Sequence, residues 1–294
     1  MRGPKTLGSV LSLGLAACVA GVPAQPQSFT IRLDANVLVR MPSGDQVLHS
    51  VPITVGPKSL QALQAATDDG TFAQGLGARL EGLAVEDVPE LARRSGPSIA
   101  ASDRGGVEVA SLAETALRSE EVVSSAALAS TFLVDFEEPA VQGVAAQLVK
   151  ERGPKPSPRE VRAFVRNHIT KPGFERVFDV ASNVAASRAG DCTEYAVLTT
   201  ALLRQVGTPA RMVLGIVIEG LLQDEGSARF FAGAHAWVEY HDGQNWRVLD
   251  AALAVKEGSS LRRAYVPLHV MRSEGLAYKR EVLELPQVRR VVLR

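Results

Sequence analysis

The chain has 294 residues, and its 32 basic side chains balance 32 acidic ones, so the formal net charge at pH 7 is zero. Hydrophobic residues make up 46% and charged residues 22% of the sequence, which is ordinary for a globular protein with a sizeable core. This balance gives no reason to expect a basic face, and we therefore expect no nucleic acid among the partners. The length allows one large domain or two small ones.

The first residues have the form of an export signal. Arg2 and Lys5 precede an apolar run, residues 7–17, that is too short to span a bilayer. We therefore expect residues 1–24 to be a signal peptide. The protein would then be exported, either to the periplasm or as an outer-membrane lipoprotein.

Two cleavage sites compete within this segment. Leu15 to Cys18 resembles a bacterial lipobox, in which the cysteine is lipidated after cleavage. Ordinary cleavage after Ala24 is the alternative, and Cys18 would then be only a small apolar residue of the signal. A lipid anchor at Cys18 is the one contact with a membrane that we expect.

Residues 28–130 predict a small, mostly β region. Residues 29–40 begin with strict alternation of apolar side chains, and residues 46–56 read as a return strand. Beyond them the signal weakens: we expect a helix near residues 58–66, short strands near 78–83 and 106–112, and a loop over 95–106.

Helical periodicity is clear after this region. Apolar residues share one face from Val141 to Val149, with Pro139 in the first turn. Ser157, Pro158 and Glu160 then form the start signal of a second helix, with Ser157 as N-cap.

The stretch GDCTEYA places Cys192 in the first turn of a third helix. Asp191 and Glu194 stand at the positions of a capping box, and Gly207 follows the last turn. The helix is apolar most of the way round, so we expect it to be buried. A helix N-terminus favours a thiolate and offers backbone N–H groups to an oxyanion. The competing interpretation is that Cys192 is a small buried apolar residue.

A nucleophile needs a base and the base needs an orienting group, and the stretch 234–252 supplies candidates for both. It predicts a β-hairpin with its turn at Asp242 and Gly243. A two-residue turn places His235 opposite Asp250. A four-residue turn, 242–245, moves Asp250 to a diagonal position but keeps it on the same face of the sheet. Either turn predicts a His–Asp pair.

Two other interpretations carry little weight. Glu239 and His241 share the face of His235, but the two histidines are six residues apart and no further ligand supports a metal site. Residues 75–80, GLGARL, lack the third glycine of a dinucleotide fingerprint. We therefore expect neither a metal nor any other cofactor.

The motifs GDCTEYA, HAWVEY and WRVLDA, in this order, resemble the transglutaminase-like superfamily, relatives of the papain-type thiol enzymes. The resemblance covers about residues 135–270. It implies an α+β, papain-like core with the nucleophile helix packed on an antiparallel sheet, preceded by the mostly-β region. We place this domain at residues 135–294.

The resemblance also implies roles: Cys192 as nucleophile, His235 as base and then acid, and Asp250 as the residue that orients the imidazole. Residues 210–220 would be the strand after the nucleophile helix. Three points differ from the family pattern or stay open. Ala251 replaces a frequent proline, and residues 221–233 read as a loop before the histidine strand. The second oxyanion donor comes from a side chain upstream of Cys192, for which Asn183 and Ser187 are within reach, or from a nearby loop.

These features predict an exported thiol enzyme that attacks peptide, isopeptide or glutamine amides through a cysteine thioester, with a protein or peptide as its substrate. Hydrolysis is favoured over transamidation because water is always present and no amine-binding site can be recognised. The alternative is a non-catalytic binding or scaffold lipoprotein of the cell envelope that retains the same fold.

Overall fold

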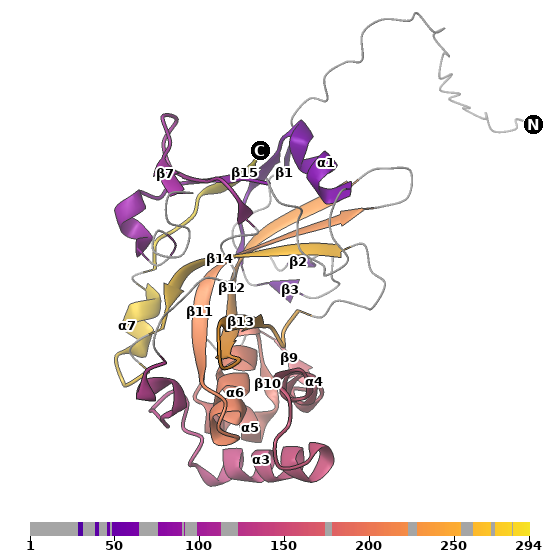
Figure 1. Ribbon diagram of the computed structural model, residues 1–294, viewed down its shortest axis with the longest axis vertical. Coiled ribbons are helices and arrows are strands. Elements are labelled where there is room, and N and C mark those ends of the chain that lie inside the picture. The colour runs from indigo at the N-terminus through magenta and orange to yellow at the C-terminus, as the bar shows by residue number, and fades with distance from the viewer. Residues whose placement is uncertain are drawn as a thin grey trace, which may run out of the picture.

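A computed structural model describes residues 29–31, 39–40, 46–47, 49–64, 76–89, 91, 99–112, 123–173, 178–222, 228–253, 261–271, 274–283 and 285–294 (Figure 1). The predicted signal peptide and the candidate lipidation site at Cys18 lie outside these residues. No helix in the described ranges is long and apolar enough to cross a membrane.

The first half of the described chain forms mainly short strands, as predicted. The strands of this part, together with the last strand of the chain, are β1 (Phe29–Ile31), β2 (Val39–Arg40), β3 (Gln46–Val47), β4 (His49–Ser50), β5 (Ile53–Val55), β6 (Ala78–Glu81), β7 (Ile99–Ala101), β8 (Val107–Val109) and β15 (Arg290–Leu293). The helices here are α1 (Pro57–Gln64), η1 (Val85–Asp87) and η4 (Ser125–Leu128), of which α1 was predicted.

A six-stranded sheet with the order β1-β5-β15-β6-β8-β7 organises this region. Strand β15 lies in its middle, parallel to β5 and antiparallel to β6. Residues 290–293 therefore pair with strands of the N-terminal region, although we expected residues 135–294 to form one domain. The boundary between the regions stays a prediction.

The predicted loop at residues 95–106 is wrong for Ile99–Ala101, which form β7 at the edge of this sheet. β7 pairs with β8 through Ile99 opposite Val109. Both Gly105 and Gly106 have positive φ angles, 79° and 96°, which allow the chain to turn back between the two strands. The loop residues visible in the sequence belong to this turn, which is why the strand beside it was missed.

The helices between residues 139 and 205 form a layer at the lower end of Figure 1, and the helix at residues 278–283 lies apart from it, beside the sheet. Both predicted capping boxes are present: Ser157 with Glu160 in front of α4, and Asp191 with Glu194 in front of α6. Gly207, with φ 82°, follows the last turn of α6 as predicted. The helices are α3 (Pro139–Arg152), α4 (Pro158–His168), α5 (Ala181–Ser187), α6 (Cys192–Gln205) and α7 (Tyr278–Leu283).

A second, antiparallel sheet has the strand order β13-β12-β11-β14, and β4 adds to the outer edge of β12. Its strands are β11 (Ala210–Leu222), β12 (Ala228–His241), β13 (Trp246–Leu249) and β14 (Leu261–Val270). A separate parallel pair is formed by β9 (Lys171–Pro172) and β10 (Ala189–Gly190).

The predicted loop at residues 221–233 is also wrong at both ends. Leu221 and Leu222 belong to β11, and residues 228–233 belong to β12, so the two strands form one long hairpin. Phe230, Phe231 and Ala232 are buried in this extension. Burial of apolar side chains on both faces removes the alternation that marks a half-exposed strand, which explains the error.

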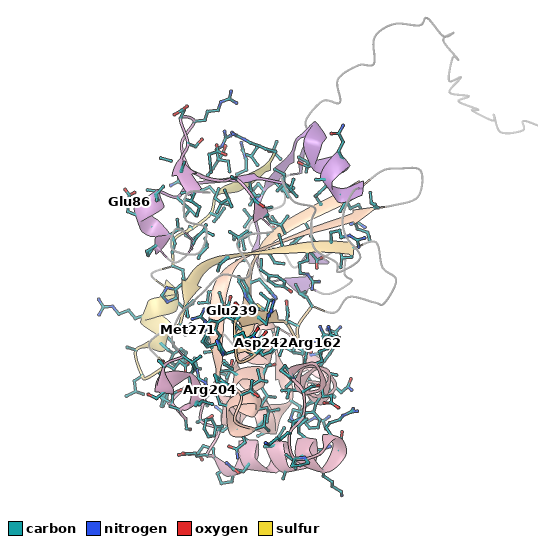
Figure 2. The ribbon with its side chains drawn as sticks, viewed as in Figure 1. Glu86, Arg162, Arg204, Glu239, Asp242 and Met271 are labelled. Atoms are coloured by element: carbon teal, nitrogen blue, oxygen red, sulfur yellow. The ribbon has the colours of Figure 1, made fainter. Side chains whose placement is uncertain are left out.

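One face of the second sheet contacts both of the other layers. At one end Met212, Leu214, Ala236 and Val238 share a core with α6 and the helices around it. At the other end Ile216, Ile218 and Val266 share a core with the six-stranded sheet. Side chains fill these two cores between the layers (Figure 2). The molecule therefore has the predicted α+β architecture, with α6 packed on an antiparallel sheet.

Candidate active site

Cys192 is the first residue of α6, and two carboxylates hold the chain around it. Asp191 Oδ1 accepts a hydrogen bond from the backbone N–H of Thr193 at 2.9 Å. Glu194 Oε2 accepts one from the backbone N–H of Asp191 at 2.9 Å. Glu194 Oε1 accepts another from the backbone N–H of Asp179 at 2.9 Å. These bonds fix the backbone at the start of the helix and with it the position of the thiol.

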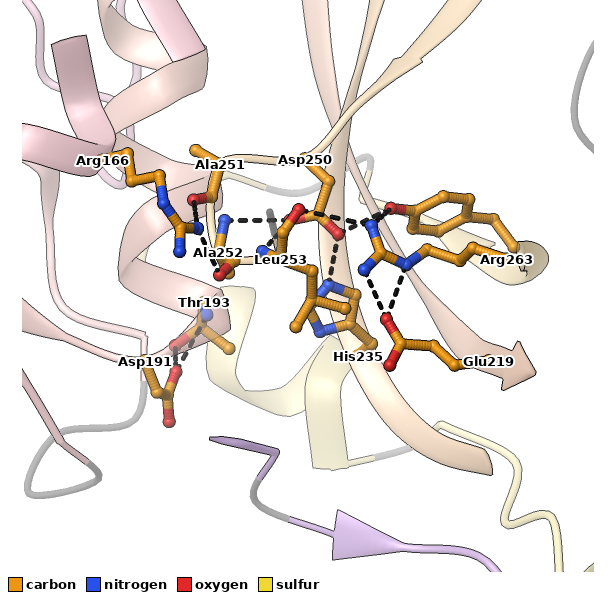
Figure 3. Close-up of polar contacts among 11 residues, drawn as sticks. Arg166, Asp191, Thr193, Glu219, His235, Asp250, Ala251, Ala252, Leu253 and Arg263 are labelled. Atoms are coloured by element: carbon orange, nitrogen blue, oxygen red, sulfur yellow. Dashed lines mark hydrogen bonds and ion pairs between the residues drawn. The ribbon is translucent and has the colours of Figure 1, made fainter. Parts of the chain in front are cut away.

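His235 and Asp250 meet on the hairpin that the sequence predicted. Strands β12 and β13 pair Val238 with Leu249, which leaves a four-residue turn at residues 242–245. Asp250 directly follows β13 and lies diagonally across from His235 on the same face. The structure therefore has the four-residue turn, the second of the two turns considered. Nε2 of His235 lies 2.8 Å from Oδ2 of Asp250 (Figure 3).

The environment of Asp250 determines which nitrogen of His235 carries the proton. Burial alone would raise the pKa of Asp250. The charge and hydrogen bond of His235, the nearby Arg263 and the N–H of Leu253 instead lower this pKa to about 2. Asp250 is therefore a carboxylate, which can only accept hydrogen bonds, so Nε2 of His235 must be the donor.

In the neutral imidazole, the other ring nitrogen, Nδ1 of His235, is then an acceptor. It is buried and has no hydrogen-bond partner among the residues that the structure describes. A buried polar atom without a partner is rare and calls for an explanation. This atom is placed to receive a proton from a group that approaches it.

The sulfur of Cys192 lies beside the residue that follows His235. On the outer edge of β12, β4 pairs at Gly233 and Ala234, and β13 pairs from Val238 onward. Residues 235–237 lie between these two paired segments. The backbone N–H of Ala236 donates a hydrogen bond to the Cys192 sulfur.

The orientation of this N–H follows from the strand pairing. The carbonyl of Ala232 faces the outer edge, because it accepts a hydrogen bond from the N–H of Val51 at 2.8 Å. Backbone groups alternate along a strand, so Ala236, four residues on, faces the same edge. Cys192 thus reaches the sheet at the gap between β4 and β13, next to His235.

The expectation that the helix N-terminus would favour a thiolate is not supported. Burial raises the pKa of the Cys192 thiol well above its ordinary value, and the negative charges of Asp191, Asp250 and Glu194 raise it further. The hydrogen bond from Ala236 opposes them. Burial and the acidic residues around the sulfur therefore keep the resting cysteine as a neutral thiol.

The two candidate side chains for the second oxyanion donor differ in their surroundings. The side-chain amide of Asn183 is exposed and donates to Oδ1 of Asp179 at 2.8 Å. The hydroxyl of Ser187 is buried and has no hydrogen-bond partner in the described part of the chain. The choice between the two stays open.

Glu239 and His241, which were considered as metal ligands together with His235, form other contacts. Glu239 Oε2 accepts a hydrogen bond from Nε of Arg211 at 3.0 Å. His241 Nδ1 accepts one from the backbone N–H of Gly243 at 3.2 Å, and its ring packs edge-on against Trp246. Within the described ranges, no group of three or more His, Cys, Asp or Glu side chains could hold a metal ion.

Three residues near Asp250 were not singled out from the sequence. The hydroxyl of Tyr265 donates to Asp250 Oδ2 at 2.8 Å, and Arg263 donates to the Tyr265 oxygen at 3.2 Å. Arg263 in turn pairs with Glu219. The available signal was one glutamate in the otherwise apolar stretch IVIEGLL and two arginines in the otherwise mostly apolar stretch LRRAYVPL.

A cysteine at the start of a buried helix, packed on an antiparallel sheet that carries a His–Asp pair, defines an α+β domain of the papain-like kind. Residues 142–251 match the sequence model of the Transglutaminase-like superfamily, and this part of the chain is a transglutaminase-like domain. The match confirms the resemblance inferred from the three motifs. No curated protein matches the chain.

Three solved structures are similar to parts of the chain. The first, titled "Putative Cysteine Protease", from Cytophaga hutchinsonii, is 20% identical over 50% of this chain and 46% of that one, with a TM-score of 0.35. The periplasmic domain of TgpA from Pseudomonas aeruginosa is 28% identical over 37% and 43%, with a TM-score of 0.27. The third, titled "Putative Protease", from Parabacteroides distasonis, is 14% identical over 68% and 42%, with a TM-score of 0.27. The chain spans less than half the length of each.

Proposed function

We propose that the protein is a thiol enzyme in which Cys192, His235 and Asp250 cleave an amide bond through a thioester. The main support is the state of His235. Its Nε2–H is held by Asp250, while its Nδ1 is buried without a partner in the described residues, and the next residue contacts the Cys192 sulfur. A base that is oriented on one side and free on the other is what an unactivated thiol requires.

In the proposed reaction, Nδ1 of His235 accepts the thiol proton as the sulfur attacks the carbonyl carbon. The new C–S bond gives a tetrahedral oxyanion. The backbone N–H of Cys192, at the first position of α6, can donate to this oxyanion, whereas the N–H of Thr193 is held by Asp191. Collapse breaks the C–N bond, His235 returns its proton to the leaving amine, and a thioester remains on Cys192.

A second nucleophile then releases the acyl group. When it is water, His235 removes a proton from it, and the products are a carboxylic acid and the free thiol. When it is an amine, the product is a new amide. We favour hydrolysis, because the same three residues serve both reactions and water needs no binding site of its own. A protein or peptide is the proposed substrate.

We also propose that the protein acts outside the cytoplasm, in the periplasm or anchored through Cys18 to the outer membrane. The support is the basic and then apolar N-terminal segment with its small residues before Cys18. Radiolabelled palmitate incorporation into the full-length chain, compared with Cys18→Ser, would test the anchor. Equal labelling of both forms would contradict it.

The function can be tested by incubating the protein with a peptide library and analysing the products by mass spectrometry. New fragments indicate hydrolysis, and crosslinked peptides indicate transfer. Cys192→Ala and His235→Gln should each abolish both kinds of product. His168→Gln is the matched control, because His168 is a half-buried histidine whose Nε2 lies 2.9 Å from the carbonyl oxygen of Ala185 and which is not paired with Asp250. Full activity in Cys192→Ala would overturn the proposal.

One observation favours the alternative, a binding or scaffold protein with the same fold. The pKa of Cys192 is raised, so the thiol is not activated in the resting protein. The two functions predict different effects of replacing His235 on the reactivity of the Cys192 thiol. An enzyme loses thiol reactivity when His235 is replaced, whereas in a scaffold the reactivity of Cys192 is indifferent to that replacement.

A further inference from the structure

Behind the His235–Asp250 pair lies a second set of buried polar residues on the neighbouring strand β14. The hydroxyl of Tyr265 donates to Oδ2 of Asp250 at 2.8 Å. The same oxygen receives the hydrogen bond from Nε2 of His235, also at 2.8 Å. We propose that Tyr265, held by Arg263, is a positioning residue that fixes the Asp250 carboxylate for His235. This inference rests on the proposed function.

The direction of each hydrogen bond in this set is fixed by chemistry. Nη1 of Arg263 lies 3.2 Å from the Tyr265 oxygen, and a guanidinium can only donate. The phenol proton must therefore point to its other neighbour, Oδ2 of Asp250. Burial and the nearby Asp250 raise the pKa of Tyr265 well above its ordinary value, so the phenol keeps this proton throughout the working pH range.

Arg263 itself is held from two sides. It lies opposite Glu219 in the pairing of β14 with β11, and its Nε donates to Glu219 Oε1 at 2.9 Å, while its Nη2 contacts the same oxygen. Its Nη1 also lies 3.3 Å from the carbonyl of Leu253, in the segment that follows Asp250. Arg263 therefore ties the strand that carries Tyr265 to the segment that carries Asp250.

All four lone-pair directions of the Asp250 carboxylate are used as a result. Oδ1 accepts from the backbone N–H groups of Ala252 and Leu253 at 2.9 and 3.0 Å, and Oδ2 accepts from His235 and Tyr265. A carboxylate with four donors cannot rotate or take up a proton without losing a bond. His235 is thereby kept in the tautomer that leaves Nδ1 free to accept the thiol proton.

The loss of hydration on burying the Glu219–Arg263 ion pair argues against a purely structural role for this pair. Glu219 and Arg263 are both buried, with side-chain exposures of 0% and 7%. A buried ion pair contributes little to stability compared with apolar residues of similar size, because both charges lose their hydration. Apolar side chains at these positions would serve the fold equally well, but they would leave Tyr265 without a partner to orient it.

The test measures the alkylation rate of Cys192 by iodoacetamide as a function of pH, which needs no knowledge of the substrate. Sulfur displaces iodide from the reagent and must first lose its proton to His235, so the rate reports on the base. The variants are Tyr265→Phe, which removes only the donor, and Arg263→Lys, which keeps the charge but not the planar fork. Tyr240→Phe is the control, because Tyr240 lies on the face of β12 opposite to the one that carries His235. Melting temperatures are recorded for all variants.

Tyr265→Phe should lower the alkylation rate near neutral pH by about tenfold, the effect of one hydrogen bond to a charged acceptor. The acid limb of the pH–rate curve should move to higher pH, because the Asp250 carboxylate then has one hydrogen-bond donor fewer. Arg263→Lys should give a smaller change in the same direction. Tyr240→Phe should leave the curve unchanged.

A wild-type rate and pH curve in the folded Tyr265→Phe protein would overturn the inference, whatever its melting temperature. If that variant does not fold, Arg263→Lys decides in the same way. His235→Ala and Asp250→Ala separate this failure from that of the proposed function. Normal alkylation in both would reject the proposed function, whereas slow alkylation in both with a normal Tyr265→Phe would reject only the role of Tyr265.

Discussion

A side chain at Gly190 would collide with Glu194. A Cβ built at Gly190 would lie 2.1 Å from Cβ and 2.5 Å from Cγ of Glu194, and the φ angle of this glycine is 152°. The carboxylate of Glu194 needs this space to reach the backbone of Asp191. The glycine in front of Cys192 therefore makes room for the cap of the helix that carries the thiol.

Replacement of Gly190 by alanine should consequently displace Glu194 and weaken the start of α6. We expect Gly190→Ala to lower the free energy of unfolding by about 3 kcal/mol, from overpacking and backbone strain together. Urea denaturation measures this change. The control is Gly207→Ala, where φ is also positive but nothing lies within 4 Å of the new Cβ. It should cost only about 1 kcal/mol, and equal losses would contradict the explanation.

Removing the charge of Asp191 should make Cys192 more acidic. After burial, the negative charge of Asp191 is the largest cause of the raised pKa of this thiol. Asn is as good an N-cap as Asp, so Asp191→Asn removes the negative charge but retains the N-cap of α6. The pH dependence of alkylation by iodoacetamide should shift to lower pH in the variant. An unchanged curve, with unchanged stability, would show that Asp191 does not control the thiol.

Glu194 should make stability depend on pH in the range between its unfolded and folded pKa values. Burial and the neighbouring Asp191 raise the pKa of Glu194 from 4.5 to about 7. The folded state therefore binds the proton more tightly, and its contribution is complete below pH 4.5 and lost as the pH rises toward 7. The loss amounts to about 3 kcal/mol at most.

Urea denaturation at several pH values tests this linkage. Glu194→Gln carries no titrating group, so the fall in unfolding free energy between pH 5 and pH 7 should flatten relative to the wild type. The carboxylate of Asp250 does not interfere, because its pKa of about 2 places its own contribution below this window. A variant with the same slope as the wild type would exclude Glu194 as the source.

Arg204 of α6 forms a buried ion pair with Glu274, at 2.6 and 2.8 Å between the paired atoms, and Figure 2 labels Arg204 in the helix layer. Arg204→Met alone leaves the Glu274 charge buried and should cost about 4 kcal/mol. The double replacement with Glu274→Leu should recover a large part of this loss. A double-mutant cycle in urea measures the coupling, and strictly additive losses would contradict it.

Local chemistry allowed much of this structure to be predicted. The caps at Ser157 and Asp191 fix the start of two helices, because each satisfies N–H groups that the helix leaves free. The face shared by His235 and Asp250 follows from the period of a strand and an even-numbered turn. These relationships hold within one helix or one hairpin, where sequence spacing determines geometry.

The parts that could not be predicted depend on pairing between distant strands. Tyr265 reaches Asp250, and Arg263 reaches Glu219, only because β14 pairs with β11 in one particular register. No spacing in the sequence encodes that register. The raised pKa of Cys192 was missed for a different reason: the helix dipole was considered without the burial of the thiol and the acidic charges around it.

The position of β15 has a consequence for how the chain reaches its native state. Strands β5 and β6 both pair with β15 and not with one another, so the middle of the six-stranded sheet is completed by residues 290–293. During synthesis on the ribosome, the edges of β5 and β6 that pair with β15 therefore stay unpaired until residues 290–293 emerge. Pairing over such a long sequence separation is slow, and exposed strand edges invite association with other chains. An assisting chaperone would find its binding sites there.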